Sequence, residues 1–112
     1  MQDWPDREHY TAEDLVQIIR ILRDPETGCP WDKVQTHASI RKNFLEETCE
    51  ALEAIDADDA DMLREELGDV LMQVAFHVVL EEERGRLNFE QVCREVCEKL
   101  GRCPAGVPPL CV

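Results

Sequence analysis

The sequence is poor in basic residues, in aromatic side chains and in long apolar runs. Its 112 residues include 12 Lys and Arg against 25 Asp and Glu, which gives a formal net charge of -13. Proteins that bind nucleic-acid backbones or anionic membrane surfaces need clustered Lys and Arg, so this balance argues against both classes of partner. No run of about 18 apolar residues is present, and we therefore expect no membrane-spanning helix.

A secretory signal and a zinc motif are also missing. The first ten residues are charged and lack the apolar segment of a signal peptide, so we expect a cytoplasmic protein. The six cysteines include no Cys-x-x-Cys pair, and no paired histidines accompany them. In a reducing compartment such cysteines are expected to be buried or half-buried thiols, and not disulfides or metal ligands.

Hydrophobic spacing predicts helices along most of the chain and no strands. Thr11 followed by Asp14 is a capping signal, and apolar residues then repeat at helical spacing until the chain meets Pro25. Residues 24–38 contain two prolines and a glycine, which indicates an ordered loop. Ser39 is the predicted cap of a second helix.

Two further helices follow short polar turns. The third is predicted to span residues 61–83, and the fourth begins at Asn88 and stops at Gly101. The tail, residues 101–112, has three prolines and no apolar period, so we expect it to be irregular. Residues 1–100 are therefore predicted to form a single all-α domain, a four-helix antiparallel bundle.

The apolar residues of each helix predict which face is buried. These residues are Leu15, Ile18, Ile19 and Leu22 in the first helix, Ile40, Phe44, Leu45, Leu52 and Ile55 in the second, Leu63, Leu67, Val70, Leu71, Val74 and Val78 in the third, and Phe89, Val92, Val96 and Leu100 in the fourth. With 5% aromatic residues the core is thin, which favours association of two chains through exposed apolar faces.

Acidic residues recur at helical spacing on the second and third helices. Glu47 and Glu50 are three residues apart, as are Glu66 and Asp69, so each pair shares one helix face. Antiparallel helices would bring the two pairs together. Adjacent carboxylates repel one another and are costly to bury, and a divalent ion that prefers oxygen ligands, Mg²⁺ or Mn²⁺, would relieve that conflict. The alternative is an ordinary solvated acidic surface.

The negative charge is concentrated in this part of the chain. Residues 46–69 hold eleven of the 25 acidic residues and a single basic one, Arg64. A polar row on the third helix falls within a sector of roughly 80° and borders the predicted core. Its members are Glu66, Asp69, Gln73 and His77.

Two segments resemble those of the MazG family of nucleoside triphosphate pyrophosphohydrolases. They read GCPWDKVQTHASIRKNFLEETCEALEAI and, further along, LREELGDVLMQVAFHVVLEE. The family pattern is EExxE, a spacer and ExxD, and it falls here on Glu46, Glu47 and Glu50 and then on Glu66 and Asp69. The GCPWD-x-x-QTH loop is the more specific part of the likeness, since acidic helix pairs are common.

The resemblance implies an all-α fold whose protomers pair, with a magnesium-dependent acidic site. The implied reaction converts a nucleoside triphosphate to the monophosphate and pyrophosphate, in nucleotide-pool cleaning. By motif position Glu47, Glu50, Glu66 and Asp69 are the implied metal ligands. Two weaker candidates, which would orient water or support the ligands, are Glu46 and Glu65.

Substrate contacts are less specific in the sequence. Candidate triphosphate partners are Lys33, Arg41, Lys42, Lys99 and Arg102, with Lys33 and Lys99 close to family motif positions. Each of these has the alternative of a solvated surface charge. Trp31 is a candidate for stacking on a base or for a packing anchor. His37 and His77 are candidates for bracing the loop and the core edge, or for contact with the site.

The sequence departs from the family after Leu100. Relatives usually continue with a basic, histidine-containing segment similar to RRHPHVF, and here Gly101, Arg102 and Cys103 follow. Many relatives also hold two such domains in tandem. Two alternatives to a general pyrophosphohydrolase therefore stay open. One is a non-catalytic helical module for metal binding or interaction, and the other is a specialised dUTP or dCTP pyrophosphatase.

Overall fold

Side-chain caps set the points at which the helices begin. The computed structural model describes residues 4–5 and 8–102, in which four α-helices and one short 3-10 helix occur and no strand is found. The α-helices are α1 (Ala12–Leu22), α2 (His37–Asp56), α3 (Ala60–Glu83) and α4 (Phe89–Gly101), and the 3-10 helix is η1 (Asp32–Val34). The predicted all-α class with four helices is therefore confirmed.

The predicted start of the second helix is wrong by one turn. The N-cap of α2 is Thr36, and Ser39 is the third helical residue. Thr36 Oγ1 accepts a hydrogen bond from the Ser39 amide at 3.2 Å, and Ser39 Oγ accepts one from the Thr36 amide at 2.8 Å. This reciprocal pair satisfies two amides at once, so the helix begins earlier than Ser39 alone would place it. Capping boxes at Thr11 and Asn88 confirm the other two predicted caps.

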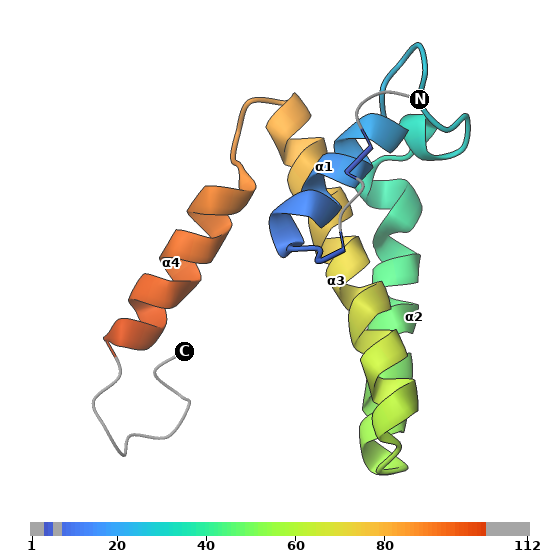
Figure 1. Ribbon diagram of the computed structural model, residues 1–112, viewed down its shortest axis with the longest axis vertical. Helices are drawn as coiled ribbons and strands as arrows, with labels where there is room; N and C mark the ends of the chain where they lie inside the picture. The colour runs from blue at the N-terminus through green and yellow to red at the C-terminus, as the bar shows by residue number, and fades with distance from the viewer. Residues whose placement is uncertain (1–3, 6–7, 103–112) are drawn as a thin grey trace.

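The core lies where α1 crosses the upper part of the α2–α3 hairpin, as Figure 1 shows. Its buried members come from three helices and are Val16, Ile19, Ile40, Ala75, Phe76, Val79 and Leu80. The prediction of the buried side of the third helix was only partly right, because Leu67 and Leu71 are exposed. The reason is that α1 covers only the later half of α3, so among the described helices the earlier half packs mainly against α2.

Several predicted core residues of α2 are also exposed. On α2 the predicted core residues Leu45, Leu52 and Ile55 are exposed, while Ile40, Ala51 and Ala54 are buried.

Four free cysteines are described. Cys49 and Cys97 are exposed, against our expectation of buried or half-buried thiols. Cys103 and Cys111 lie outside the described residues.

Arginines on α1 join this helix to the end of α3. Arg20 Nε donates to Glu82 Oε1 at 2.7 Å, and Arg23 Nε donates to Glu83 Oε2 at 2.7 Å. Arg23 also donates to the carbonyls of Asp32 and Gln35 and so holds the 24–36 loop against the core. Gly28 sits so close to the backbone of Leu22 and Asp24 that a Cβ would collide with it, so this loop needs glycine there.

Helix α4 stands apart from the other three helices (Figure 1). Its first residue, Phe89, packs against the core, while Val96 and Leu100 further along are exposed. The helix includes Gly101, one residue beyond its predicted end. Residues 103–112, most of the predicted irregular tail, lie outside the described residues. None of the described helices is both long and apolar enough to span a membrane.

Candidate metal centre

The α2–α3 hairpin brings acidic residues from two helices to one place. The turn is tight, and Asp58 within it has a left-handed backbone conformation with φ of 52°. Glu47 on α2 then lies opposite Glu66 and Asp69 on α3, and one carboxylate oxygen from each of the three lies within 4.8 Å of the others. All three residues are half-buried. The predicted convergence of two acidic pairs therefore holds for these three residues.

The fourth predicted ligand, Glu50, is more exposed but belongs electrostatically to the same cluster. Hydrogen bonding with Glu50 is the main reason that the pKa of Glu66 is raised to about 7, followed by burial and by the charges of Glu50, Asp69 and Glu47. Burial, followed by repulsion from Glu50 and Asp69, raises the pKa of Glu47 as well. These carboxyl groups therefore resist carrying their full negative charge together.

The cluster contains buried carboxylate oxygens without hydrogen-bond partners, which a bound cation would stabilise. Glu47 Oε2 and Glu66 Oε2 are buried and have no hydrogen-bond partner in the described part of the chain. Arg64, the single basic residue between positions 46 and 69, is directed elsewhere, with its Nη2 at 2.9 Å from Asp61 Oδ1 on the surface. Carboxylate oxygens are preferred ligands of Mg²⁺ and Mn²⁺, so this donor set fits such an ion.

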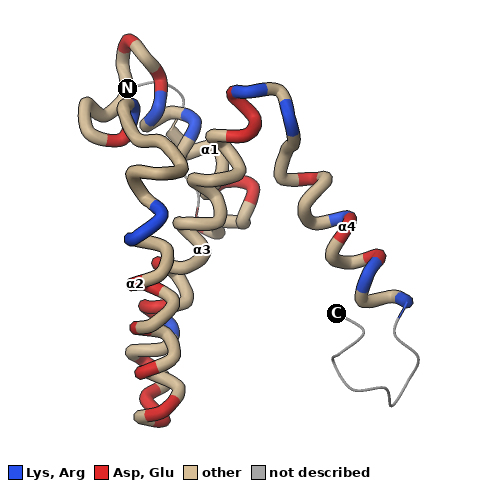
Figure 2. The backbone as a smooth tube through the Cα atoms, turned by 180° about the vertical axis from the view of Figure 1, so that it is seen from behind, with Lys and Arg blue, Asp and Glu red and all other residues tan. Residues whose placement is uncertain are grey.

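The two weaker candidates, Glu46 and Glu65, directly precede the cluster residues Glu47 and Glu66 in the sequence. Both residues are exposed, and Glu46 Oε1 lies 3.7 Å from Lys42 Nζ one helical turn earlier. Lys42, the partner of Glu46 in this contact, is one of the predicted substrate-binding residues. Figure 2 shows how densely acidic residues occupy the lower part of the α2–α3 hairpin.

The predicted substrate residues are spread over the molecule. Trp31 has 61% of its surface exposed, and Lys33 Nζ donates to the Pro25 carbonyl at 3.2 Å. Arg41 is exposed on α2. Lys99 and Arg102 are at the end of α4, which stands away from the acidic hairpin (Figure 2). Within one chain, the structure gathers the carboxylates but does not gather these basic residues around them.

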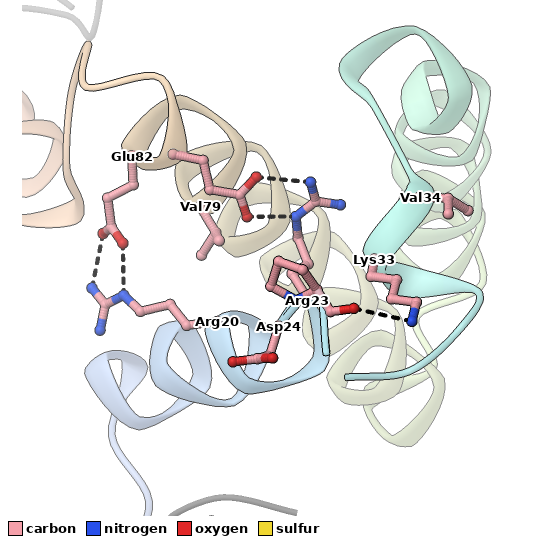
Figure 3. Close-up of a pocket in the computed structure, with 9 residues that line it drawn as sticks. Arg20, Arg23, Asp24, Lys33, Val34, Val79 and Glu82 are labelled. Atoms are coloured by element: carbon pink, nitrogen blue, oxygen red, sulfur yellow. Dashed lines mark hydrogen bonds and ion pairs between the residues drawn. The ribbon is translucent and has the colours of Figure 1, made fainter. Parts of the chain in front are cut away.

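One cavity of the described structure lies away from the carboxylates. It has a volume of about 700 Å³ and lies between α1, the 24–36 loop and the end of α3. Figure 3 shows Arg20 and Arg23 beside it, both engaged in ion pairs, and Lys33 on the far wall. Its charged side chains are thus paired with one another or with backbone, which favours a structural role for this region.

A histidine network at the upper end of the hairpin is a feature that the sequence only partly signalled. His37 Nδ1 lies 2.6 Å from His77 Nδ1, and His37 Nε2 lies 2.7 Å from Glu81 Oε2. Arg86 then donates to both oxygens of Glu81. Hydrogen bonds from Arg86 and then His37 lower the pKa of Glu81 to about 2. The QTH motif and the polar row pointed to both histidines, but no spacing rule indicated Glu81 or Arg86.

Comparison with known proteins gives a consistent picture. The profile of the MazG nucleotide pyrophosphohydrolase domain matches residues 35–107. A nucleoside triphosphate pyrophosphohydrolase of Escherichia coli K12 is 51% identical over 88 residues, which cover 79% of this chain and 34% of that protein. The nucleoside triphosphate pyrophosphohydrolase/pyrophosphatase MazG of Thermotoga maritima is 51% identical over 90 residues, covering 80% of this chain and 35% of that protein.

A more distant relative from Mycobacterium tuberculosis, also a nucleoside triphosphate pyrophosphohydrolase, is 40% identical over 98 residues, covering 86% of this chain and 30% of that protein. The chain therefore spans about a third of the length of each of these relatives. The matched part contains the acidic hairpin and the loop motif that precedes it.

Proposed function

Since this chain belongs to the MazG nucleotide pyrophosphohydrolase family, we propose that it hydrolyses nucleoside triphosphates to a monophosphate and pyrophosphate. The observation that carries the proposal is the cluster of Glu47, Glu66 and Asp69, half-buried and close together, with unpartnered oxygens. A triphosphate alone would be repelled by such a cluster. It can approach only if cations lie between the carboxylates and the phosphates.

The proposed cofactor is Mg²⁺, with Mn²⁺ as the alternative, and the proposed ligands are Glu47, Glu50, Glu66 and Asp69. A bound divalent ion supplies stabilisation of charge on the phosphate oxygens and a lowered pKa for coordinated water. The residues of the chain hold and orient these groups. Glu46 is the proposed acceptor of the proton that the attacking water loses, because it adjoins Glu47 and is exposed to solvent. Glu65 is a weaker candidate for the same role.

The triphosphate would also need positive charge from the protein. Proposed contacts are Trp31, Lys33, Arg41, Lys42, Lys99 and Arg102, of which Arg41 and Lys42 belong to the same helix as Glu47. Their support is the family resemblance and, for all of them except the half-buried Lys33, their exposure. Nucleotide-pool cleaning in the cytoplasm is the proposed role and place, because free nucleoside triphosphates are the substrate.

We also propose that the working form is a homodimer or a higher homo-oligomer. The lower half of the hairpin exposes large apolar side chains on both helices, a pattern that favours burial against another chain. They are Leu45, Leu52, Ile55, Leu67, Leu71 and Met72, each at least 39% exposed. The apolar residues Val96 and Leu100 of α4 are exposed in the same way.

A panel of ribo- and deoxyribonucleoside triphosphates with Mg²⁺, scored for pyrophosphate and for inorganic phosphate, tests the function. Pyrophosphate together with a monophosphate is expected. Inorganic phosphate together with a diphosphate would refute the proposed bond cleavage. Turnover confined to dUTP or dCTP would favour the specialised alternative, and metal binding without nucleotide binding would favour the non-catalytic module.

A further inference from the structure

Two histidines at the upper end of the hairpin meet through the same ring nitrogen. His37 is the first residue of α2, and His77 lies in the later half of α3. Their Nδ1 atoms are 2.6 Å apart, and their rings are nearly parallel, at 4° with centroids 4.9 Å apart. A contact this short between two nitrogens is a hydrogen bond only if one carries a proton and the other offers a lone pair. The two Nδ1 atoms therefore hold one proton between them.

The other ring nitrogen of His37 faces an ionised carboxylate. His37 Nε2 lies 2.7 Å from Glu81 Oε2, and hydrogen bonds from Arg86 and then His37 lower the pKa of Glu81 to about 2. Glu81 is therefore negatively charged in neutral and mildly acidic solution, and His37 Nε2 carries a proton and donates to it. Over this range only the Nδ1 atom of His37 can gain or lose a proton.

This bonding pattern decides which charge states of the pair can keep the contact. With no added proton, both rings are neutral and His77 Nδ1 donates to the lone pair of His37 Nδ1. With one added proton, His37 is the charged ring and its Nδ1 donates to His77, which stays neutral. With two added protons, both Nδ1 atoms carry hydrogens and both rings are positive. This last state cannot keep a 2.6 Å contact, because two donors and two like charges face each other.

The surroundings favour a charge on His37 over a charge on His77. His37 lies beside Glu81, whereas burial, followed by the charge of His37, lowers the pKa of His77. His77 Nε2 is also buried and has no hydrogen-bond partner in the described part of the chain. A second proton on the pair therefore goes to a ring whose surroundings disfavour its charge.

The other charged side chains around the pair are in ion pairs with one another. On α2 the next charged residue after His37 is Arg41, which is exposed, and α4 presents the apolar Val92 on this side. Glu81 is the carboxylate that contacts the pair, and it does so at His37. The charged side chains near the pair are Arg23 after α1, Glu81 and Glu83 on α3, and Arg84 and Arg86 in the turn that follows.

The pair joins three segments that are far apart in the sequence. His37 directly follows the 24–36 loop, and Glu81 also accepts hydrogen bonds from Arg86 in the turn that leads to α4. Arg23 holds the same loop through two backbone carbonyls and does not contact the histidines. Separation of the two rings would therefore free the first turn of α2 and the end of the loop, while Arg23 keeps its hold on the loop.

His37 is the ring that can move outward. Its side chain is 37% exposed, whereas the ring of His77 also stacks on Phe44, with centroids 5.4 Å apart. Separation of the rings would therefore carry His37 toward solvent and leave His77 in place on α3.

We propose that the His37–His77 pair is an acid-sensitive latch between the start of α2 and the end of α3. It is closed with no added proton or with one, and uptake of a second proton separates the two rings. Opening releases the first turn of α2 and changes the position of the adjoining 24–36 loop, without requiring a change at the acidic cluster. The latch goes beyond the proposed hydrolysis and is independent of it.

Imidazole nitrogen NMR of the full chain in a chelating buffer, from pH 8 to pH 4, tests the shared proton. The first added proton is expected to make His37 cationic and to move the hydrogen of His77 from Nδ1 to Nε2 in the same step. The second is expected to reach His77 only below pH 6.5, the ordinary pKa of histidine. Independent titration of the two rings, with the His77 tautomer unchanged by the first step, would overturn the proposal.

Amide hydrogen exchange over the same pH range tests the opening. The Ile40 amide donates to the Thr36 carbonyl across the first turn of α2, so its exchange reports on that turn. After correction for intrinsic rates, the protection of residues 40–43 is expected to fall at least about tenfold with the second proton, while residues 51–54 keep theirs. Unchanged protection of residues 40–43 would overturn the latch.

His37→Gln removes the second charge and keeps an acceptor. The Gln amide oxygen can accept from His77 Nδ1 whether or not His77 is charged, so the loss of protection in acid should disappear. His77 should also titrate closer to pH 6.5, because the charge of His37 no longer opposes its own. The matched control is His9→Gln, at an exposed position outside the pair, which should keep the wild-type response. An undiminished loss of protection in His37→Gln would contradict the latch.

The acidic cluster titrates in the same pH range and needs its own control. The pKa of Glu66 is raised to about 7, and Glu66→Gln removes that titration. This variant should keep the loss of protection at residues 40–43. Disappearance of the loss would assign the opening to the acidic cluster and overturn the latch. Pyrophosphate release is not part of these measurements, so failure of the latch leaves the proposed function in place.

Discussion

The two ends of the α2–α3 hairpin use the same kind of residue in opposite ways. At the upper end, Glu82 and Glu83 each meet an arginine at 2.7 Å, and Glu81 meets Arg86 and His37. At the lower end, Glu47 and Glu66 meet other carboxylates and keep oxygens without partners. Paired carboxylates join helices and stabilise a fold, whereas clustered ones lower stability unless something outside the chain binds them. The contrast separates the structural end from the chemical end.

The largest expected effect is the loss of turnover when the lower end loses a carboxylate. Asp69→Asn should reduce pyrophosphate release at least about 100-fold, because a ligand of the proposed metal is lost, while the helical circular-dichroism signal is retained. Glu50→Ala should do the same. The matched control is Glu53→Gln on α2, an exposed acidic residue outside the cluster, which should keep its activity. Unchanged turnover in Asp69→Asn would remove this residue from the site.

Substitutions at the upper end of the hairpin should change the free energy of unfolding. Arg23 has only 10% of its side chain exposed and binds Glu83 together with two backbone carbonyls. Arg23→Ala should lower the free energy of unfolding by about 2–3 kcal/mol, because two half-buried carbonyls and a carboxylate lose their donor. Arg94→Ala, which removes an exposed ion pair with Glu90, should cost at most about 0.5 kcal/mol. Urea unfolding of both variants measures the difference, and equal losses would contradict the comparison.

The metal-free chain should become more stable as the pH falls from 8 toward 5. The pKa of Glu66 is raised to about 7 in the folded chain, above the ordinary value of 4.5, so folding favours its protonated form. The destabilisation is present above the folded pKa and is relieved as Glu66 takes up its proton. Thermal unfolding in a chelating buffer measures this trend. Glu66→Gln should flatten it, and a wild-type midpoint that rises with pH over this window would contradict it.

The smallest effect is the opposite pH dependence at the upper end. The pKa of Glu81 is lowered to about 2, so its contribution to stability is complete above about pH 4.5 and is lost as the pH falls through about 2. Arg86→Gln removes the largest cause of the lowered pKa and should reduce the loss of stability over this acid range. Acid titration followed by circular dichroism measures the slope. An unchanged slope in Arg86→Gln would assign the acid sensitivity to other carboxylates.

Local signals were enough to predict much of the fold. Some signals act over a single helical turn and can therefore be recognised in the sequence. They are the caps at Thr11 and Asn88 and the i, i+3 spacing of the acidic pairs. The exposure of Leu67 and Leu71 was not predictable in this way, since it depends on how far α1 reaches along α3. The position of α4 away from the other three helices also depends on tertiary contacts, and its apolar residues alone do not determine it.

Only part of the candidate site could be predicted from the sequence, as was the case for the fold. Helical spacing placed Glu47, Glu66 and Asp69 on facing surfaces, and the structure brings them together. The exposed position of Lys99 on α4 and the link between His37 and Glu81 depend on contacts between segments far apart in the chain. Spacing rules describe one element at a time, so they could not reveal either arrangement.

The most direct test of the contrast between the two ends is calorimetric titration of the chain with Mn²⁺ at pH 6.5, in two buffers of different ionisation enthalpy. Saturable binding with release of protons is expected, because a metal ion at the lower end displaces the proton that Glu66 holds near neutral pH. Asp69→Asn should abolish the binding and Glu53→Gln should not. Absence of saturable binding, or binding that survives in Asp69→Asn, would contradict the assignment of the unpaired carboxylates to a metal centre.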